Sequence, residues 1–173
     1  QPTVTLSPSV GHDVIPREWM RSYKSGPSRF REVGVRELRW VESLPSWPGR
    51  PEFTLLLDPT LMVTREEWAE IASLSPSDKP YILVYALGDL LPEQRSFIAE
   101  LSEMHGLEVR WLSERVGGEL WATNAADFLG MASRAACVVT DSYHGAIFSF
   151  LFDRPLALIR RHGFAGAMNA RVE

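Results

Sequence analysis

From residue 81 onward, continuous apolar runs of strand length alternate with segments whose apolar residues recur at helical spacing. Runs without polar alternation are typical of strands that are buried on both faces, as in a parallel sheet. The pattern predicts strands at 81–87, 107–112, 136–140 and 155–159, with helices at 92–105, 125–135 and 145–152. Parallel strands joined by helices require right-handed crossovers, so we expect an α/β fold with a Rossmann-like parallel sheet covered on both faces.

The first third of the chain differs, because proline and glycine interrupt it every few residues. Its elements should therefore be short. We expect strands at 3–6, 33–37 and 53–57 and helices at 16–23 and 28–32. Thr64, with Glu67 three residues later, forms a capping-box pattern that predicts a helix over 65–73. The change of pattern predicts two parts, residues 1–57 and residues 58–173.

The composition excludes several classes of protein. The 173 residues carry a net charge of −4 with both signs interspersed, which disfavours a nucleic-acid surface. The single cysteine, Cys137, cannot form an internal disulfide, and no histidine or cysteine spacing predicts a metal site. No uncharged apolar stretch reaches about 18 residues, and the first residues lack a signal-peptide pattern. We therefore expect a cytoplasmic protein, without metal or cofactor, that can work near a membrane.

The sequence after the predicted strand 136–140 reads Asp-Ser-Tyr-His-Gly, so polar residues lead from a strand into a helix. The N-terminus of a helix favours a phosphate or carboxylate, because its N–H groups and its dipole point at the ligand. His144 in this turn can bond a phosphate oxygen or transfer a proton near neutral pH. The same residues also fit an alternative, in which Asp141 or Ser142 only caps the helix and His144 fills space.

Arginines stand near other predicted strand ends. Arg36 ends an early strand, Arg160 and Arg161 follow the last one, and Arg171 lies near the end of the chain. Guanidinium groups bind phosphate and carboxylate in a bidentate manner, although each of these side chains alone is more often a solvated charge. Gly88 follows the strand at 81–87 and fits either a close approach to a ligand or an ordinary turn.

Several short motifs occur along the chain in a distinctive order. They are Gly-Val-Arg-Glu at 34–37, Leu-Asp-Pro-Thr-Leu-Met at 57–62, Glu-Trp at 67–68, Tyr-Ile-Leu-Val-Tyr-Ala-Leu-Gly at 81–88, Asp-Phe-Leu at 127–129, Val-Thr-Asp-Ser-Tyr-His-Gly at 139–145, Phe-Ser at 148–149 and Asn-Ala-Arg-Val at 169–172. In order and spacing, over most of residues 30–173, the chain resembles the polysaccharide pyruvyl transferase family.

The resemblance implies a transferase that moves pyruvate from phosphoenolpyruvate to a pair of saccharide hydroxyls as a ketal, in surface-polysaccharide synthesis. It also implies a GT-B-like architecture of two facing Rossmann-like halves. The acceptor would be a saccharide or a lipid-linked glycan, with peripheral association at a membrane. His144 becomes the donor-phosphate ligand and a candidate general acid, although the sequence leaves the identity of the acid open. The candidate substrate-binding residues are Arg36, Gly88, Asp141, Ser142, Tyr143, Gly145, Arg160, Asn169 and Arg171.

The chain departs from the family pattern at both ends. Family members usually carry an upstream loop with Gly and Asn, a first nucleotide-fold half, and helices beyond the position of Arg171. We therefore expect a chain truncated at the N-terminus and the C-terminus, with residues 1–57 as the remnant of the N-terminal half. Two alternatives remain from the sequence: a GT-B-type glycosyltransferase that uses a nucleotide sugar, and a non-catalytic domain that binds a glycan or a partner.

Overall fold

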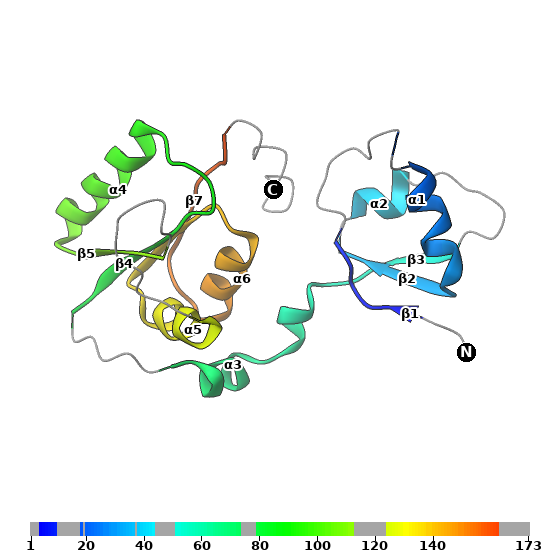
Figure 1. Ribbon diagram of the computed structural model, residues 1–173. Coiled ribbons are helices and arrows are strands. Elements are labelled where there is room, and N and C mark those ends of the chain that lie inside the picture. Colours follow the sequence, from blue (N-terminus) through cyan, green and yellow to red (C-terminus); the bar gives the residue numbers. More distant parts are fainter. Residues whose placement is uncertain are drawn as a thin grey trace. The chain divides into compact units, whose positions relative to one another are not determined.

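The computed structural model describes residues 4–9, 18, 20–36, 38–43, 51–73, 79–112 and 124–162. The chain divides into two compact units, Gln1–Met62 and Val63–Glu173. Each unit is an α/β unit with its own parallel sheet (Figure 1). The predicted α/β fold with parallel, Rossmann-like sheets is thus confirmed. None of the helices in the described ranges combines the length and the apolar composition needed to cross a membrane.

The first unit has a three-stranded sheet in the order β1-β2-β3, with all pairs parallel. Along the chain its elements are β1 Val4–Thr5, α1 Met20–Ser25, η2 Pro27–Arg29, β2 Glu32–Val35, α2 Leu38–Ser43, β3 Glu52–Leu55 and η3 Pro59–Met62. The central strand is buried through Val33 and Val35, and Phe53 of β3 lies beside Val33 in the sheet register.

Two segments of the first unit differ from the sequence prediction. The helix expected at 28–32 is only the 3-10 turn Pro27–Arg29, and Glu32 already belongs to β2. This turn ends at Phe30, whose backbone is extended and whose N–H donates to the carbonyl of Pro27. The helix α2 was not predicted, because its six residues are too short for a periodic pattern to be recognised.

The second unit has a four-stranded sheet in the order β5-β4-β6-β7, again with all pairs parallel. Its elements are α3 Arg65–Ile71, β4 Tyr81–Tyr85, α4 Pro92–His105, β5 Glu108–Trp111, α5 Ala125–Arg134, β6 Cys137–Thr140, α6 Tyr143–Leu151 and β7 Leu156–Leu158. All four predicted strands and all three predicted crossover helices are therefore present, with ends that differ by a few residues.

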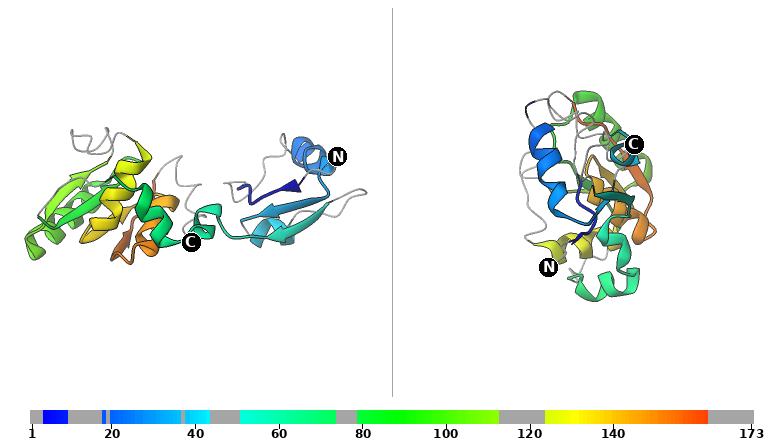
Figure 2. Two further views of the ribbon diagram at one scale, coloured as in Figure 1. Left: turned by 90° about the horizontal axis from the view of Figure 1, so that it is seen from below. Right: turned by 90° about the vertical axis from the view of Figure 1, so that its right-hand side faces the viewer.

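Helices cover both faces of this sheet (Figures 1 and 2). Side chains of β4 alternate between the faces: Leu83 packs with α5 and α6, whereas Ile82 and Val84 pack with Ile98 of α4. Trp68 of α3 joins the first of these clusters. The sheet is thus the middle layer of a three-layer unit, as its continuous apolar strands indicate.

Capping residues set the ends of several helices. The predicted capping box is confirmed: Thr64 accepts from the N–H of Glu67, and the Glu67 carboxylate accepts from the N–H of Thr64. The hydrogen bonds that the N–H and the hydroxyl of Thr64 donate to the Glu67 carboxylate lower the pKa of Glu67. Gly106 ends α4 in the left-handed conformation, with φ of 62°, which glycine adopts without a steric penalty. The helix α6 begins at Tyr143, before the predicted start, because Ser142 caps it.

Candidate anion site at the carboxyl edge of the second sheet

The strand order of the second unit defines a switch point between β4 and β6. The chain runs outward from β4 to β5, then returns past β4 to form β6 and β7. In doubly wound sheets, ligands bind outside the carboxyl ends of the strands at such a reversal. Here the segment after β4 includes Gly88, and the turn after β6 leads into α6. These two segments are the candidate site.

Buried hydroxyl groups hold the turn between β6 and α6. Thr140 has no exposed surface, and its hydroxyl donates to the carbonyl of Tyr85 at 2.6 Å. The same oxygen accepts from the N–H of Ser142 at 3.0 Å. The Ser142 hydroxyl in turn accepts from the N–H of Gly145 at 3.3 Å, which satisfies one N–H of the first helical turn. Ser142 therefore caps α6, which is one of the two interpretations that the sequence allowed for this residue.

Gly145 allows α6 to begin very close to β6. A Cβ atom at this position would lie 2.4 Å from the Thr140 hydroxyl oxygen and 3.1 Å from its Cβ and Cγ2. Real Cβ atoms do not approach other atoms so closely. The glycine is therefore required for packing, which is a reason independent of any ligand.

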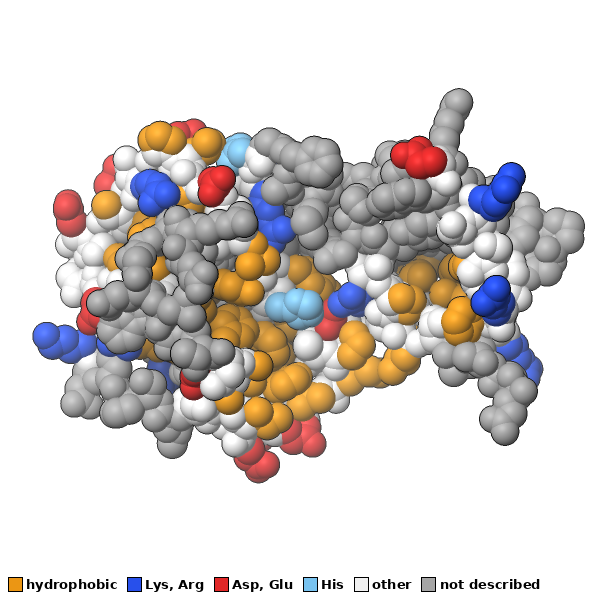
Figure 3. Space-filling view, viewed as in Figure 1, with side chains coloured by type: hydrophobic (Ala, Val, Ile, Leu, Met, Phe, Trp, Pro, Cys, Tyr) orange, Lys and Arg blue, Asp and Glu red, His pale blue; other side chains and the backbone are white. Residues whose placement is uncertain are grey.

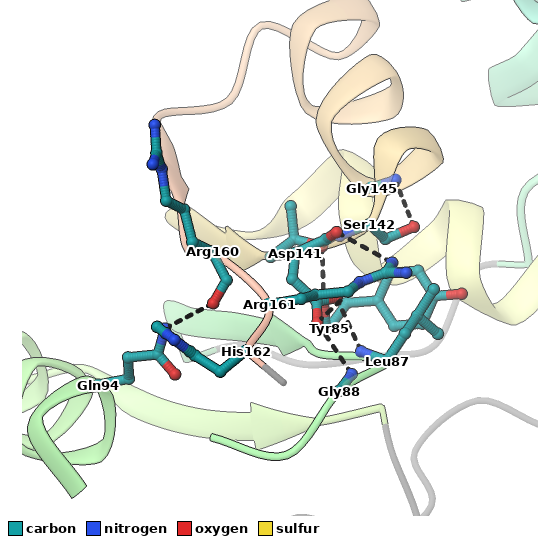
Figure 4. A network of polar contacts seen from close by, with 11 residues as sticks. Tyr85, Leu87, Gly88, Gln94, Asp141, Ser142, Gly145, Arg160, Arg161 and His162 are labelled. Atoms are coloured by element: carbon teal, nitrogen blue, oxygen red, sulfur yellow. Dashed lines mark hydrogen bonds and ion pairs between the residues drawn. The ribbon is translucent and has the colours of Figure 1, made fainter. Parts of the chain in front are cut away.

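Asp141 links the two segments of the switch point (Figure 4). Its Oδ1 accepts from the N–H of Leu87 at 2.8 Å, and its Oδ2 accepts from the N–H of Gly88 at 2.9 Å. Arg161 approaches the same carboxylate, with Nε 3.2 Å from Oδ2, and its Nη2 donates to the Asp141 carbonyl at 3.0 Å. Both carboxylate oxygens are thus engaged by protein groups in a side chain that is almost fully buried.

His144 lies in the first turn of α6 and is exposed, whereas Asp141 and Ser142 before it are buried. The rings of Tyr143 and His144 meet edge to face, with centroids 5.5 Å apart. Histidine side chains reach the surface in the view of Figure 3. Among the predicted site residues 141–145, His144 is exposed, Tyr143 is half-buried and the others are buried, so His144 is the one most open to solvent and ligands.

The segment after β7 contributes differently from the prediction. The sequence favoured Arg160, but Arg160 is exposed and its side chain points away from Asp141 in Figure 4, whereas Arg161 contacts the turn. The carbonyl of Arg160 accepts from Gln94 Nε2 at 2.9 Å, and this amide nitrogen also lies 3.4 Å from Nε2 of His162. Strand β7 ends at Leu158, so side-chain alternation could not show which of the two arginines faces the turn.

Arg36 belongs to the first unit, and its proximity to His144 stays a prediction. It lies just beyond β2, where its guanidinium pairs with the buried carboxylate of Asp58. Asp58 also accepts from the N–H and hydroxyl of Thr60, at 3.0 and 2.6 Å. Asn169 and Arg171, also predicted site residues, lie outside the described residues. Within the described ranges, no group of histidine, cysteine, aspartate and glutamate side chains is arranged to hold a metal ion.

The second unit is a doubly wound, Rossmann-like α/β unit with a capped helix and an exposed histidine at its switch point. The family model of polysaccharide pyruvyl transferases matches residues 1–163. Because the match covers more than half of the chain, the chain belongs to the polysaccharide pyruvyl transferase family, as its motifs predict. It is therefore assigned to a family of transferases of polysaccharide biosynthesis. A search of curated proteins and a search of solved structures each give no match.

Proposed function

We propose that this protein transfers pyruvate from phosphoenolpyruvate to two hydroxyls of a saccharide, forming a ketal and releasing phosphate. The observation that carries the proposal is the exposed His144 in the first turn of α6, at the switch point of the second sheet. The donor has a phosphate and a carboxylate, and the positive end of a helix favours such anions. Membership of the pyruvyl transferase family supports a donor of pyruvate.

The proposed reaction consumes phosphoenolpyruvate and two saccharide hydroxyls and releases phosphate. A proton adds to the methylene carbon of phosphoenolpyruvate, which gives an oxocarbenium-like centre at the adjacent carbon. One saccharide hydroxyl attacks that carbon and loses its proton. The bond between the carbon and the phosphate oxygen then breaks, phosphate leaves, and the second hydroxyl closes the ketal with loss of its proton. Stabilisation of the negative charge on the departing phosphate is the main contribution expected from the site.

The residues of the turn have different proposed roles. His144 donates a hydrogen bond to the donor phosphate, and it is also a candidate for the proton donor. Tyr143 beside it and the backbone at Gly88 and Gly145 shape the binding surface. Arg36, Arg160, Asn169 and Arg171 remain proposed ligands of the donor or the acceptor. We further propose a saccharide or lipid-linked glycan as the acceptor and a cytoplasmic location near the membrane.

Calorimetric titration of the chain with phosphoenolpyruvate tests the proposal. His144→Ala should weaken donor binding roughly 10- to 100-fold, because a hydrogen bond to a charged group contributes about 1.5–3 kcal/mol. His105→Gln is the matched control, since this exposed histidine lies in the last turn of α4, away from the carboxyl edge, and its replacement should leave affinity unchanged.

Three results would count against the proposal. Equal donor affinity of folded His144→Ala and the unsubstituted chain would exclude His144 as the phosphate ligand. Binding of a uridine diphosphate sugar but not of phosphoenolpyruvate would indicate a glycosyltransferase. Absence of binding to any phosphorylated donor would indicate a non-catalytic domain.

A further inference from the structure

The carboxylate of Asp141 connects three segments that are distant in sequence. It accepts from the backbone N–H groups of Leu87 and Gly88 after β4, and it pairs with Arg161 after β7. Asp141 itself follows β6 directly. One side chain therefore ties together the carboxyl ends of three neighbouring strands at the switch point (Figure 4).

Asp141 lies directly before the N-cap of α6. Ser142, the next residue, is the N-cap of α6, and His144 lies in the first turn. The distance between the segment after β4 and this turn is fixed by two hydrogen bonds of 2.8 and 2.9 Å. We propose that Asp141, held by Arg161, is a positioning residue that orients the first turn of α6 and with it His144, and that it does not contact the donor. The inference rests on the proposed function and deepens it, because it assigns roles to Asp141 and Arg161.

A direct role of Asp141 in donor binding fits these contacts poorly. Both oxygens already accept hydrogen bonds from the backbone, and the side chain is 3% exposed. A carboxylate facing an anionic donor would also repel it. Arg161 supplies the opposite charge that a buried carboxylate requires, and its bond to the Asp141 carbonyl holds the backbone of the turn at the same time.

Charge and geometry have opposite effects in the variant Asp141→Asn. Removal of a negative charge beside Arg161 would by itself tighten the binding of an anion. The asparagine retains the size of the side chain, but its NH2 group would face a backbone N–H that needs an acceptor. If Asp141 positions the turn, phosphoenolpyruvate affinity should therefore fall, roughly 10-fold or more, in spite of the favourable change in charge.

The double variant Asp141→Asn with Arg161→Gln removes one charge of each sign, so its net charge equals that of the unsubstituted chain. If Asp141 positions the turn, the double variant should also bind phosphoenolpyruvate weakly. If Asp141 acts only through its charge, the double variant should bind phosphoenolpyruvate about as tightly as the unsubstituted chain. Glu108→Gln is the matched control, because Arg110 Nε lies 3.2 Å from Glu108 Oε1 at the amino end of β5, and this variant should bind normally.

The ring signals of His144 give a measurement that needs no donor. In chains labelled with ¹³C at histidine, the signal absent from His144→Gln identifies this ring among the four histidines. Asp141→Asn and the double variant should shift the His144 signals in ligand-free protein, and Glu108→Gln should leave them in place. If Asp141→Asn does not fold by circular dichroism, Arg161→Gln alone should still shift the signals, since it removes the bond to the Asp141 carbonyl.

The two measurements separate the inference from the proposed function. Shifted His144 signals together with weaker donor binding support positioning. The positioning role is overturned if the His144 signals do not shift, if Asp141→Asn binds the donor as well as or better than the unsubstituted chain, and if the double variant binds it normally. If the unsubstituted chain does not bind phosphoenolpyruvate, the proposed function fails, whereas the ring signals still decide whether Asp141 and Arg161 orient His144.

Discussion

Replacement of Gly145 by alanine tests how closely α6 must approach β6. The added Cβ would lie 2.4 Å from the hydroxyl oxygen of Thr140. Thr140 cannot move away easily, because its hydroxyl is bonded to the Tyr85 carbonyl and to the N–H of Ser142. Overpacking of this kind costs about 1–3 kcal/mol, and each disturbed hydrogen bond adds about 1 kcal/mol. The better helix propensity of alanine offsets at most about 1 kcal/mol.

We therefore expect Gly145→Ala to lower the free energy of unfolding by about 2–3 kcal/mol, which corresponds to a fall in Tm of about 4–12 °C. Thermal melting followed by circular dichroism measures this change. In the background Thr140→Ala, which removes the clashing hydroxyl and methyl, Gly145→Ala should have almost no further effect. The difference between the two backgrounds is a coupling energy of about 2 kcal/mol.

The control for this cycle is Gly106→Ala. A Cβ at Gly106 meets nothing within 4 Å, but the left-handed backbone there disfavours alanine. Gly106→Ala should lower the free energy of unfolding by about 1–2 kcal/mol, and by the same amount with Thr140 and with Thr140→Ala. Equal destabilisation by Gly145→Ala with and without the Thr140 side chain, or no destabilisation at all, would show that the close approach does not limit this turn.

Three further predictions concern other parts of the chain. Gly130→Ala should destabilise the second unit by about 3 kcal/mol in urea unfolding, because its Cβ would meet the backbone oxygen of Ser73 at 1.8 Å. Arg36→Met should destabilise the first unit by up to about 3 kcal/mol, because the buried Asp58 carboxylate loses the pairing with Arg36. Adding Asp58→Asn to this variant should restore part of the lost stability, because it removes the buried charge. Burial raises the pKa of the Cys137 thiol, so at pH 8 iodoacetamide should alkylate it more slowly in the native chain than in urea, as mass spectrometry can measure; equal rates would contradict this.

The fold of the second unit was predictable because its central strand β4 is apolar on both faces. The buried residues Ile82, Leu83 and Val84 pack alternately with α4 and with α5 and α6, so no polar residue interrupts the strand. The sequence shows this burial directly as a continuous apolar run. In the first unit the described helices have six residues or fewer, and such short elements give too little periodic pattern to place every helix.

The turn that forms the candidate site was predictable as a location, but the contacts of its residues were less so. A polar turn between a buried strand and a helix indicated residues 141–145, and the exposed His144 lies there. The sequence could not show that Arg161, and not Arg160, contacts Asp141, because neither residue is part of a strand or helix. The hydrogen bonds of Thr140 to Tyr85 and of Asp141 to Gly88 join residues more than 50 positions apart, so no local pattern indicates them.

The buried polar residues of the turn follow from a requirement of the backbone. Beyond the carboxyl end of β4 the N–H groups of Leu87 and Gly88 both donate to the side chain of Asp141, since backbone N–H groups need an acceptor in the folded chain. Asp141 supplies two acceptor oxygens with the spacing of these two groups. The sequence alone therefore cannot show whether a small acidic residue after a strand binds a ligand or accepts hydrogen bonds from backbone N–H groups. Burial distinguishes the two cases: Asp141 is 5% exposed, whereas His144 three positions later is exposed, which is why we propose His144, and not Asp141, as the residue that contacts the donor.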